Sequence, residues 1–100
     1  MIEPGVTVTI TLTAKPGMEA SLEQVLTGLI NPSRGEDGCL NYCMHRCLDH
    51  PGEFMLYMNW RDEAAFNRHS ASPWVQEFHA HQADLLLQEP SVMKRWRHLG

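Results

Sequence analysis

The chain has 100 residues, of which 43% are hydrophobic and 20% are charged, and its formal net charge is −4. This composition predicts one globular domain over residues 1–100, and the negative charge argues against binding to nucleic acid. The N-terminus lacks the basic and apolar regions of a signal peptide, and no apolar run reaches the roughly 18 residues of a membrane span. We therefore expect a cytoplasmic protein that does not associate with a membrane.

The first third of the chain predicts a strand followed by a helix. From Val6 to Ala14, valine, isoleucine, leucine and alanine alternate with threonine, which is typical of a strand. Lys15-Pro16-Gly17 breaks this pattern, and apolar residues then recur at helical spacing from Met18 to Ile30. Asn31-Pro32 is expected to end the helix, so residues 33–38 are predicted to form a polar loop.

Two further strands are predicted on either side of a turn at His50-Pro51-Gly52. The first runs from Cys39 to Leu48 and the second from Phe54 to Trp60. In the second strand both alternating sets of residues are apolar, which is typical of a strand that is covered on both faces.

The last third predicts two helices and a final strand. Asp62 is a good N-cap for a short helix from Glu63 to His69. Ser72-Pro73 then begins a helix that runs to Leu87. Its predicted apolar stripe consists of Trp74, Val75, Phe78, Leu85 and Leu86. The final strand is short and basic and covers Ser91 to His98.

The predicted order βαββααβ favours an α+β, ferredoxin-like fold, in which helices cover one face of a four-stranded antiparallel sheet. The strand from Phe54 to Trp60 needs cover on its other face as well. We therefore expect a homodimer in which two sheets pack face to face.

The cysteine and histidine patterns do not favour a metal site. Cys39, Cys43 and Cys47 recur every four residues, but on a strand this spacing is roughly 13 Å, too far for a disulfide or a shared metal ion. Only a helix in this region would place the three thiols together. On a helix, the rings of His79 and His81 point about 200° apart, so they cannot bind one ion together.

His69 is the main candidate for acid–base chemistry, because its spacing from Ala65 and Phe66 turns it toward the sheet. It is either a core histidine bonded to a backbone carbonyl or a proton acceptor that lines a pocket. Asn59 and Trp60 end a strand that leads into a helix, where clefts form, but their side chains lie on opposite faces of the sheet. Aromatic residues that either line such a pocket or simply pack in the core are Tyr42, Tyr57, Phe66, Trp74 and Phe78.

Several of these segments, in this order and spacing, resemble the antibiotic biosynthesis monooxygenase domain over about residues 6–97. They are Ala14-Lys15-Pro16-Gly17, Gly38-Cys39-Leu40-x-Tyr42, Phe54-x-Leu56-Tyr57-x-Asn59-Trp60-x-Asp62-x-x-Ala65-Phe66-x-x-His69, and Ser72-Pro73. The resemblance implies the ferredoxin-like fold and a dimeric α/β barrel with back-to-back sheets.

The resemblance also implies an activity: a monooxygenase that uses O₂ without a metal or organic cofactor. Its small-molecule substrate would be an electron-rich, enolisable aromatic compound, quinol-like or anthrone-like, that is oxidised to a quinone. His69 would be the base or a proton relay, Trp60 and Asn59 would position the substrate or a peroxy intermediate, and the aromatic residues named above, with His79, would bind substrate. Many relatives carry glutamate where this chain has Met58.

Two alternatives remain open at this stage. One is a dimeric small-molecule-binding or stress-related module without turnover. The other is suggested by a branch of the superfamily that degrades haem with an asparagine, a tryptophan and an axial histidine. Trp60 and His79 match the last two by spacing, but Val8 and Thr9 stand where the asparagine is needed.

Overall fold

The computed structural model describes residues 5–100; Met1–Pro4, which bear on the expectation about the N-terminus, lie outside the described residues. Among residues 5–100, no helix is both long enough and apolar enough to cross a bilayer. The elements follow in the order β1 (Val6–Thr13), α1 (Glu19–Gly28), α2 (Ile30–Arg34), β2 (Cys39–Arg46), β3 (Glu53–Trp60), α3 (Glu63–Ser70), α4 (Pro73–Glu77), the π-helical turn η1 (Phe78–Gln82), α5 (Ala83–Leu86) and β4 (Val92–Trp96).

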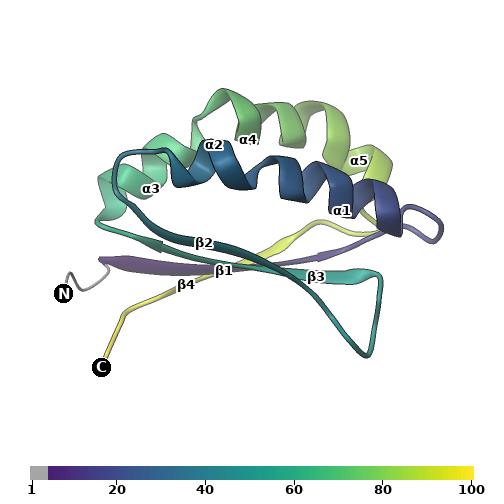
Figure 1. Cartoon of the computed structure of the whole chain (residues 1–100), viewed down its shortest axis with the longest axis horizontal. Helices are drawn as coiled ribbons and strands as arrows, with labels where there is room; N and C mark the ends of the chain where they lie inside the picture. Colours follow the sequence, from purple (N-terminus) through teal and green to yellow (C-terminus); the bar gives the residue numbers. More distant parts are fainter. Residues whose placement is uncertain (1–4) are drawn as a thin grey trace.

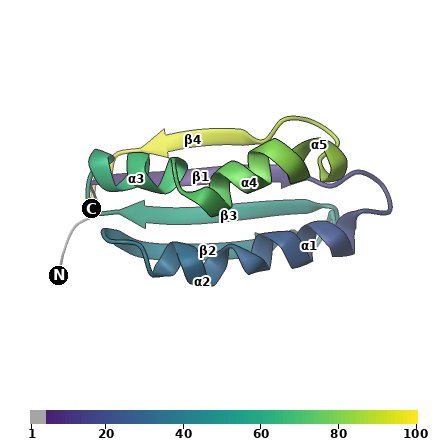
Figure 2. The same cartoon turned by 90° about the horizontal axis from the view of Figure 1, so that it is seen from above.

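The four strands form one antiparallel sheet in the order β2-β3-β1-β4. All helices lie on one face of this sheet, and the other face is bare in the single chain (Figure 1). Seen from above, α1 and α2 run over the β2 side, while α3, α4 and α5 lie over the β1 side (Figure 2). The predicted α+β, ferredoxin-like fold is confirmed.

The alternation in β1 sets which side chains enter the core. Val6, Val8 and Leu12 are buried on the helix-covered face, and the threonines between them point to the bare face. Two clusters of buried side chains result. One, beneath α3, contains Val6, Val8, Tyr42, Leu56, Met58, Trp60, Ala65 and Phe66. The other, beneath α1 and α5, contains Leu12, Ala14, Leu22, Leu26, Phe54, Phe78, Leu86 and Leu87.

Asn31-Pro32 does not end the helical segment, so the loop predicted for residues 33–38 begins later. The chain instead begins a new helical turn, α2, after α1 stops at Gly28. Pro32 has no N–H to donate to α1, but the first turn of a helix leaves such donors unpaired in any case, so the ring is tolerated there. Asn31-Pro32 therefore accompanies a break between two helices and does not end the helical segment.

The helix predicted from Pro73 to Leu87 is interrupted by η1. A π-helical turn contains an extra residue relative to an α-helical turn, so the residues after it rotate around the helix axis. Leu85, predicted to be in the apolar stripe, is consequently 66% exposed, whereas Leu86 and Leu87 are buried. The prediction for Leu85 is wrong because it assumed one uninterrupted period of 3.6 residues.

Two strand boundaries also differ from the prediction. β2 ends at Arg46, and Leu48 beyond it is 96% exposed. β4 covers only Val92–Trp96. Cys39, Cys43 and Cys47 are half-buried and form no disulfide, as the strand spacing of this region predicts.

Candidate functional site

A small cavity of about 50 Å³ lies between the sheet and the helices. It is located where the two buried clusters meet, and Ile10 and Met44 contact both clusters. Most of its lining is aliphatic or aromatic, and His69 and His79 supply the imidazoles. The lining side chains are those of Ile10, Leu12, Leu26, Leu29, Tyr42, Met44, Leu56, His69, Val75, Phe78, His79 and Ser91.

His69 reaches this cavity because α3 begins at a defined residue. The Asp62 side chain accepts a hydrogen bond from the Ala65 N–H at 2.8 Å and caps the helix. Ala65, Phe66 and His69 then occupy the buried face of α3. Only 4% of His69 is exposed, which confirms the predicted inward orientation.

The imidazole of His69 packs among aromatic rings. Its centroid lies 4.6 Å from that of Trp60, with the planes tilted by 32°, and Tyr42 meets it edge-on at 5.6 Å. Phe66 lies farther away, at 6.4 Å. Trp60 therefore forms a floor under the imidazole, and Tyr42 forms a wall beside it.

The hydrogen-bond partner of His69 is a carboxylate, not the backbone carbonyl considered as the alternative. Glu36 Oε2 lies 2.6 Å from His69 Nδ1 and accepts a second hydrogen bond, at 3.3 Å, from Trp74 Nε1. Glu36 is in the loop after α2, and the sequence analysis did not single it out. A buried histidine must have a partner, but the sequence offers twelve acidic residues and no means of choosing among them.

The indole N–H of Trp60 does not point to a ligand position. It donates to Met58 Sδ at 3.4 Å, and both side chains are fully buried. Met58 is thus a packing residue at the position where the resemblance led us to look for a carboxylate. In this chain the carboxylate next to the imidazole comes from Glu36.

Asn59 and Tyr57 lie on the opposite face of the sheet from His69. Asn59 Oδ1 accepts a hydrogen bond from Thr7 Oγ1 at 2.7 Å, and both residues are buried. Tyr57 is 39% exposed on the same face. Of the predicted site residues, Tyr42, His69, Phe78 and His79 line the cavity. Trp60 and Phe66 pack against His69, and Trp74 is linked to it through Glu36. Asn59 and Tyr57 are separated from them by the sheet.

Burial keeps the phenol and the thiol nearest this cluster in their protonated forms. Burial raises the pKa of the Tyr42 hydroxyl, and the negative charge of Glu36 adds to the increase. Burial likewise raises the pKa of the Cys39 thiol, and Glu36 again adds to the effect. Tyr42 is therefore a hydrogen-bond donor near neutral pH rather than a base.

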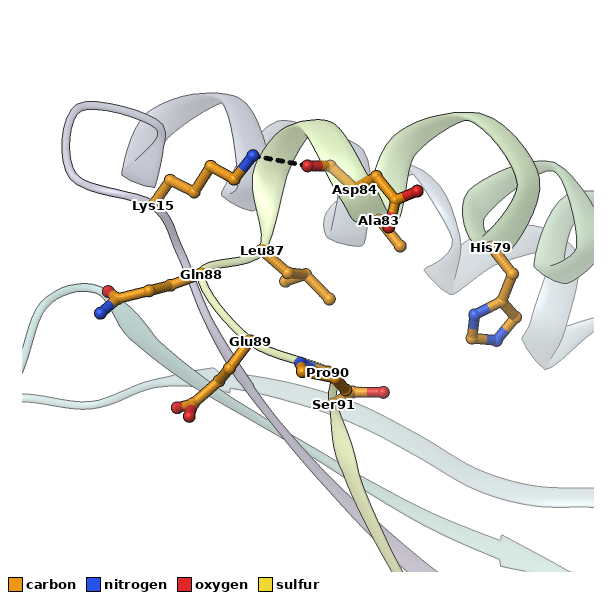
Figure 3. A pocket seen from close by; sticks show the side chains of 9 residues that line it. All are labelled: Lys15, His79, Ala83, Asp84, Leu87, Gln88, Glu89, Pro90 and Ser91. Atoms are coloured by element: carbon orange, nitrogen blue, oxygen red, sulfur yellow. Dashed lines mark hydrogen bonds between the residues drawn. The ribbon is translucent and has the colours of Figure 1, made fainter.

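A wider hollow of about 500 Å³ opens beside the cavity, and we call it the vestibule (Figure 3). Its walls contain both polar and apolar side chains, and Lys15 Nζ donates a hydrogen bond to the Asp84 carbonyl at 2.6 Å. His79 and Ser91 line both the vestibule and the cavity. They stand at the boundary between the two spaces.

The basic final strand is engaged within the chain. The guanidinium of Arg95 forms an ion pair with Glu63 and lies 6.0 Å from the centre of the Phe66 ring. This arrangement fits a charged edge strand.

Comparisons with known proteins identify the family and agree with the fold. The sequence profile of the antibiotic biosynthesis monooxygenase family matches residues 5–81. Rv0793 of Mycobacterium tuberculosis is 31% identical over 78 residues, which are 78% of this chain and 76% of that protein. The crystal structure of PA3566 from Pseudomonas aeruginosa matches with a TM-score of 0.91 and 32% identity, over 100% of this chain and 99% of that one. The structure of Rv0793 matches with a TM-score of 0.89 and 29% identity over 95% of both chains.

Proposed function

Because this chain belongs to the antibiotic biosynthesis monooxygenase family, we propose that it oxidises an enolisable, electron-rich aromatic compound of the anthrone or quinol type with O₂. The proposal needs no metal or organic cofactor. The observation that carries it is the buried imidazole of His69, which lines an apolar cavity and rests on Trp60. Such a site can remove a proton from a bound substrate while it keeps bulk water away.

The chemistry is simplest for an anthrone. His69 takes a proton from the substrate CH₂ group, and the resulting enolate transfers one electron to O₂. The carbon radical and superoxide combine into a peroxide, which recovers the proton from His69 and eliminates water. The balance is R₂CH₂ + O₂ → R₂C=O + H₂O.

Two side chains assist in this scheme without changing their own oxidation state. Tyr42 is protonated near neutral pH as an ordinary phenol is, and burial raises its pKa further, so its O–H can donate to the anionic oxygen of the enolate or to the peroxide. Trp60 offers a flat apolar surface on which the imidazole is held. The substrate is held by the aliphatic and aromatic lining of the cavity.

Substrate entry requires the cavity to enlarge. Its volume of about 50 Å³ is far below the roughly 300–1,000 Å³ of a typical small-molecule pocket. We infer that the segment from α4 to α5, which lines the cavity through Val75, Phe78 and His79, moves outward to admit substrate. The vestibule then leads past His79 and Ser91 to His69.

Oxygen consumption tests the proposal. Purified protein is incubated with an anthrone or a reduced naphthoquinone, and an oxygen electrode records uptake above the spontaneous rate. His69→Ala should abolish the enzymatic uptake, and Trp60→Phe should lower it, with circular dichroism confirming that both variants fold. His50→Ala, which removes an exposed imidazole in the β2–β3 turn, is the matched control and should behave as the unmodified protein.

The same experiment distinguishes the alternatives. No uptake above background across a panel of such compounds would contradict turnover and favour a binding module. Haem degradation has little support from the positions of Val8 and Thr9. Val8 is completely buried, and the Thr9 hydroxyl accepts a hydrogen bond from Trp96 on the bare face of the sheet. A haem titration in which a Soret shift disappears in His79→Ala would be needed to support that activity.

We also propose that the protein is a homodimer whose bare sheet faces pack together. Three large side chains, Tyr57, Val92 and Trp96, are 39%, 54% and 50% exposed on that face, next to the buried Asn59–Thr7 pair. Sedimentation should give a dimer for the unmodified chain and a monomer for Tyr57→Glu. Leu48→Glu, at a position that is 96% exposed outside the sheet, is the control and should remain dimeric; a monomeric unmodified chain would overturn the proposal.

A further inference from the structure

Glu36 and His69 come from distant parts of the chain and meet in a nearly closed environment. They are 33 positions apart in sequence, and Glu36 Oε2 lies 2.6 Å from His69 Nδ1. The side chains of His69 and Glu36 are only 5% and 13% exposed. This pair is therefore largely shielded from water, unlike a surface ion pair, which contributes little to stability.

The bond to Trp74 determines which way the hydrogen bonds run. An indole N–H can only donate, so Glu36 Oε2 accepts from Trp74 Nε1 at 3.3 Å. A carboxylate oxygen on which two ring nitrogens converge is best satisfied when both donate to it. The Nδ1 of His69 then carries the proton, and in the neutral ring Nε2 is left with its lone pair.

The second nitrogen is the one available for chemistry. Within residues 5–100, Nδ1 is the only nitrogen of this ring with a hydrogen-bond partner, and the ring lines the cavity. The same logic operates wherever a buried carboxylate holds a histidine in the tautomer that a general base needs.

The loop that carries Glu36 is held on both sides of that residue. The Glu36 N–H donates to Ser33 O at 3.1 Å, and the Glu36 carbonyl accepts from the Cys39 N–H at 3.2 Å. The guanidinium of Arg61 binds both carboxylate oxygens of Asp37, at 3.2 and 3.1 Å. Glu36 is thus placed before any ligand arrives, which is what a positioning group requires.

We propose that Glu36 is a positioning residue that holds His69 in the tautomer with Nδ1 protonated, and that Trp74 in turn orients Glu36. This inference rests on the proposed function, in which Nε2 of His69 receives the substrate proton. Many relatives carry a glutamate in β3 at the position of Met58. In this chain the inference places the supporting carboxylate on the loop after α2, at Glu36.

Glu36→Leu is the decisive variant because it keeps much of the side-chain volume and removes the oxygen that accepts from His69 Nδ1. Nδ1 then loses its only hydrogen-bond partner within residues 5–100, and the ring can adopt the tautomer in which Nε2 carries the proton and cannot act as a base. Glu36→Gln is the conservative control, because its amide oxygen can take the place of Oε2 and accept from both Trp74 Nε1 and His69 Nδ1. Two-dimensional ¹⁵N–¹H NMR of the histidine rings reports the tautomer directly, since protonated and unprotonated ring nitrogens resonate far apart. We expect Nδ1–H at His69 in the unmodified protein and in Glu36→Gln, and loss of that tautomer in Glu36→Leu.

The exposed pair Glu77–His81 supplies a matched control. Its Oε2–Nδ1 distance is 2.8 Å, but its side chains are 59% and 68% exposed. Glu77→Leu removes the same kind of pair without touching the cavity and should leave the His69 spectrum unchanged. Trp74→Phe, which removes one donor and adds none, should shift His69 partly toward a tautomer mixture and provides a second variant should Glu36→Leu fold poorly.

Kinetics separate positioning from a structural role. With an anthrone as substrate, Glu36→Leu should lower kcat by about 10- to 100-fold while KM changes by less than about twofold, and Glu36→Gln should retain most of the activity. A His69 tautomer that is the same in the unmodified protein, Glu36→Leu and Trp74→Phe overturns the inference. If the unmodified protein consumes no O₂ but Glu36→Leu still changes the tautomer, the positioning by Glu36 stands and the proposed oxygenase activity falls.

Discussion

Replacement of Gly38 by alanine tests whether the loop that carries Glu36 is pressed against α3. Gly38 has a φ of +86°, and a Cβ added there would lie 2.5 Å from the Ala65 Cβ. The left-handed conformation costs an L-residue about 1–2 kcal/mol, and an extra methyl group in a packed contact costs about 1–3 kcal/mol. The free energy of unfolding should therefore fall by about 2–5 kcal/mol, a large share of the roughly 5–15 kcal/mol of a small domain.

Two other glycines allow the two terms to be measured separately. Gly17 has a φ of +87° but no atom within 4 Å of an added Cβ, so Gly17→Ala should cost only the backbone term of about 1–2 kcal/mol. At Gly35 the φ is −78°, and the nearest atom to an added Cβ is 3.6 Å away. Gly35→Ala should therefore be neutral or stabilising by up to about 1 kcal/mol.

Urea unfolding of the three single variants gives these free energies, and a double variant isolates the contact. Gly38→Ala combined with Ala65→Gly removes the clashing methyl group, so the pair should show a favourable coupling of about 1–3 kcal/mol. The reasoning is refuted if Gly38→Ala costs no more than Gly17→Ala, or if the coupling is zero. Histidine NMR on Gly38→Ala would then also show an undisturbed His69, because the loop would not depend on this contact.

Three further predictions concern titratable groups. The raised pKa of Tyr42 contributes stability below about pH 10 that is lost as the pH rises toward the higher folded value, so Tyr42→Phe should flatten the alkaline fall in urea stability; an unchanged fall would contradict this. The Ala65 N–H bond lowers the pKa of Asp62, with help from Arg61; this stability is present above about pH 4 and lost as the pH falls. Asp62→Asn should therefore show a shallower acid-side decline in Tm than the unmodified protein, and an equally steep decline would count against the cap. Because burial raises the pKa of Cys39, iodoacetamide at pH 8 should modify it more slowly than free cysteine, with mass spectrometry as the readout; equal rates would show that the thiol is not shielded.

The fold could be predicted because its signals are local. The threonine alternation in β1, the cap at Asp62 and the Ser72-Pro73 start each act within a few residues, and together they indicate the order of strands and helices. The opposite faces of Asn59 and Trp60 also followed from the period of two in a strand. These signals do not depend on distant contacts, so the structure preserves them.

The parts that could not be predicted depend on contacts between distant segments. The π-helical turn η1 adds a residue inside the helical segment. Because this segment has no proline or glycine between Pro73 and Leu87, its sequence gives no indication of the extra residue or of the outward position of Leu85. Glu36 is one polar residue in a polar loop, and only the packing of that loop against α3 brings it to His69. The sequence thus predicted the imidazole of the candidate site, whereas its partner carboxylate required the structure.

Isotope labelling tests the central claim most directly. The unmodified protein is supplied with an anthrone and ¹⁸O₂, and mass spectrometry of the product is recorded before the carbonyl exchanges with water. The account predicts one ¹⁸O atom in the new carbonyl group and no accumulation of hydrogen peroxide, with the labelled product lost in His69→Ala. An unlabelled product, or equal labelling with and without the His69 imidazole, would contradict it.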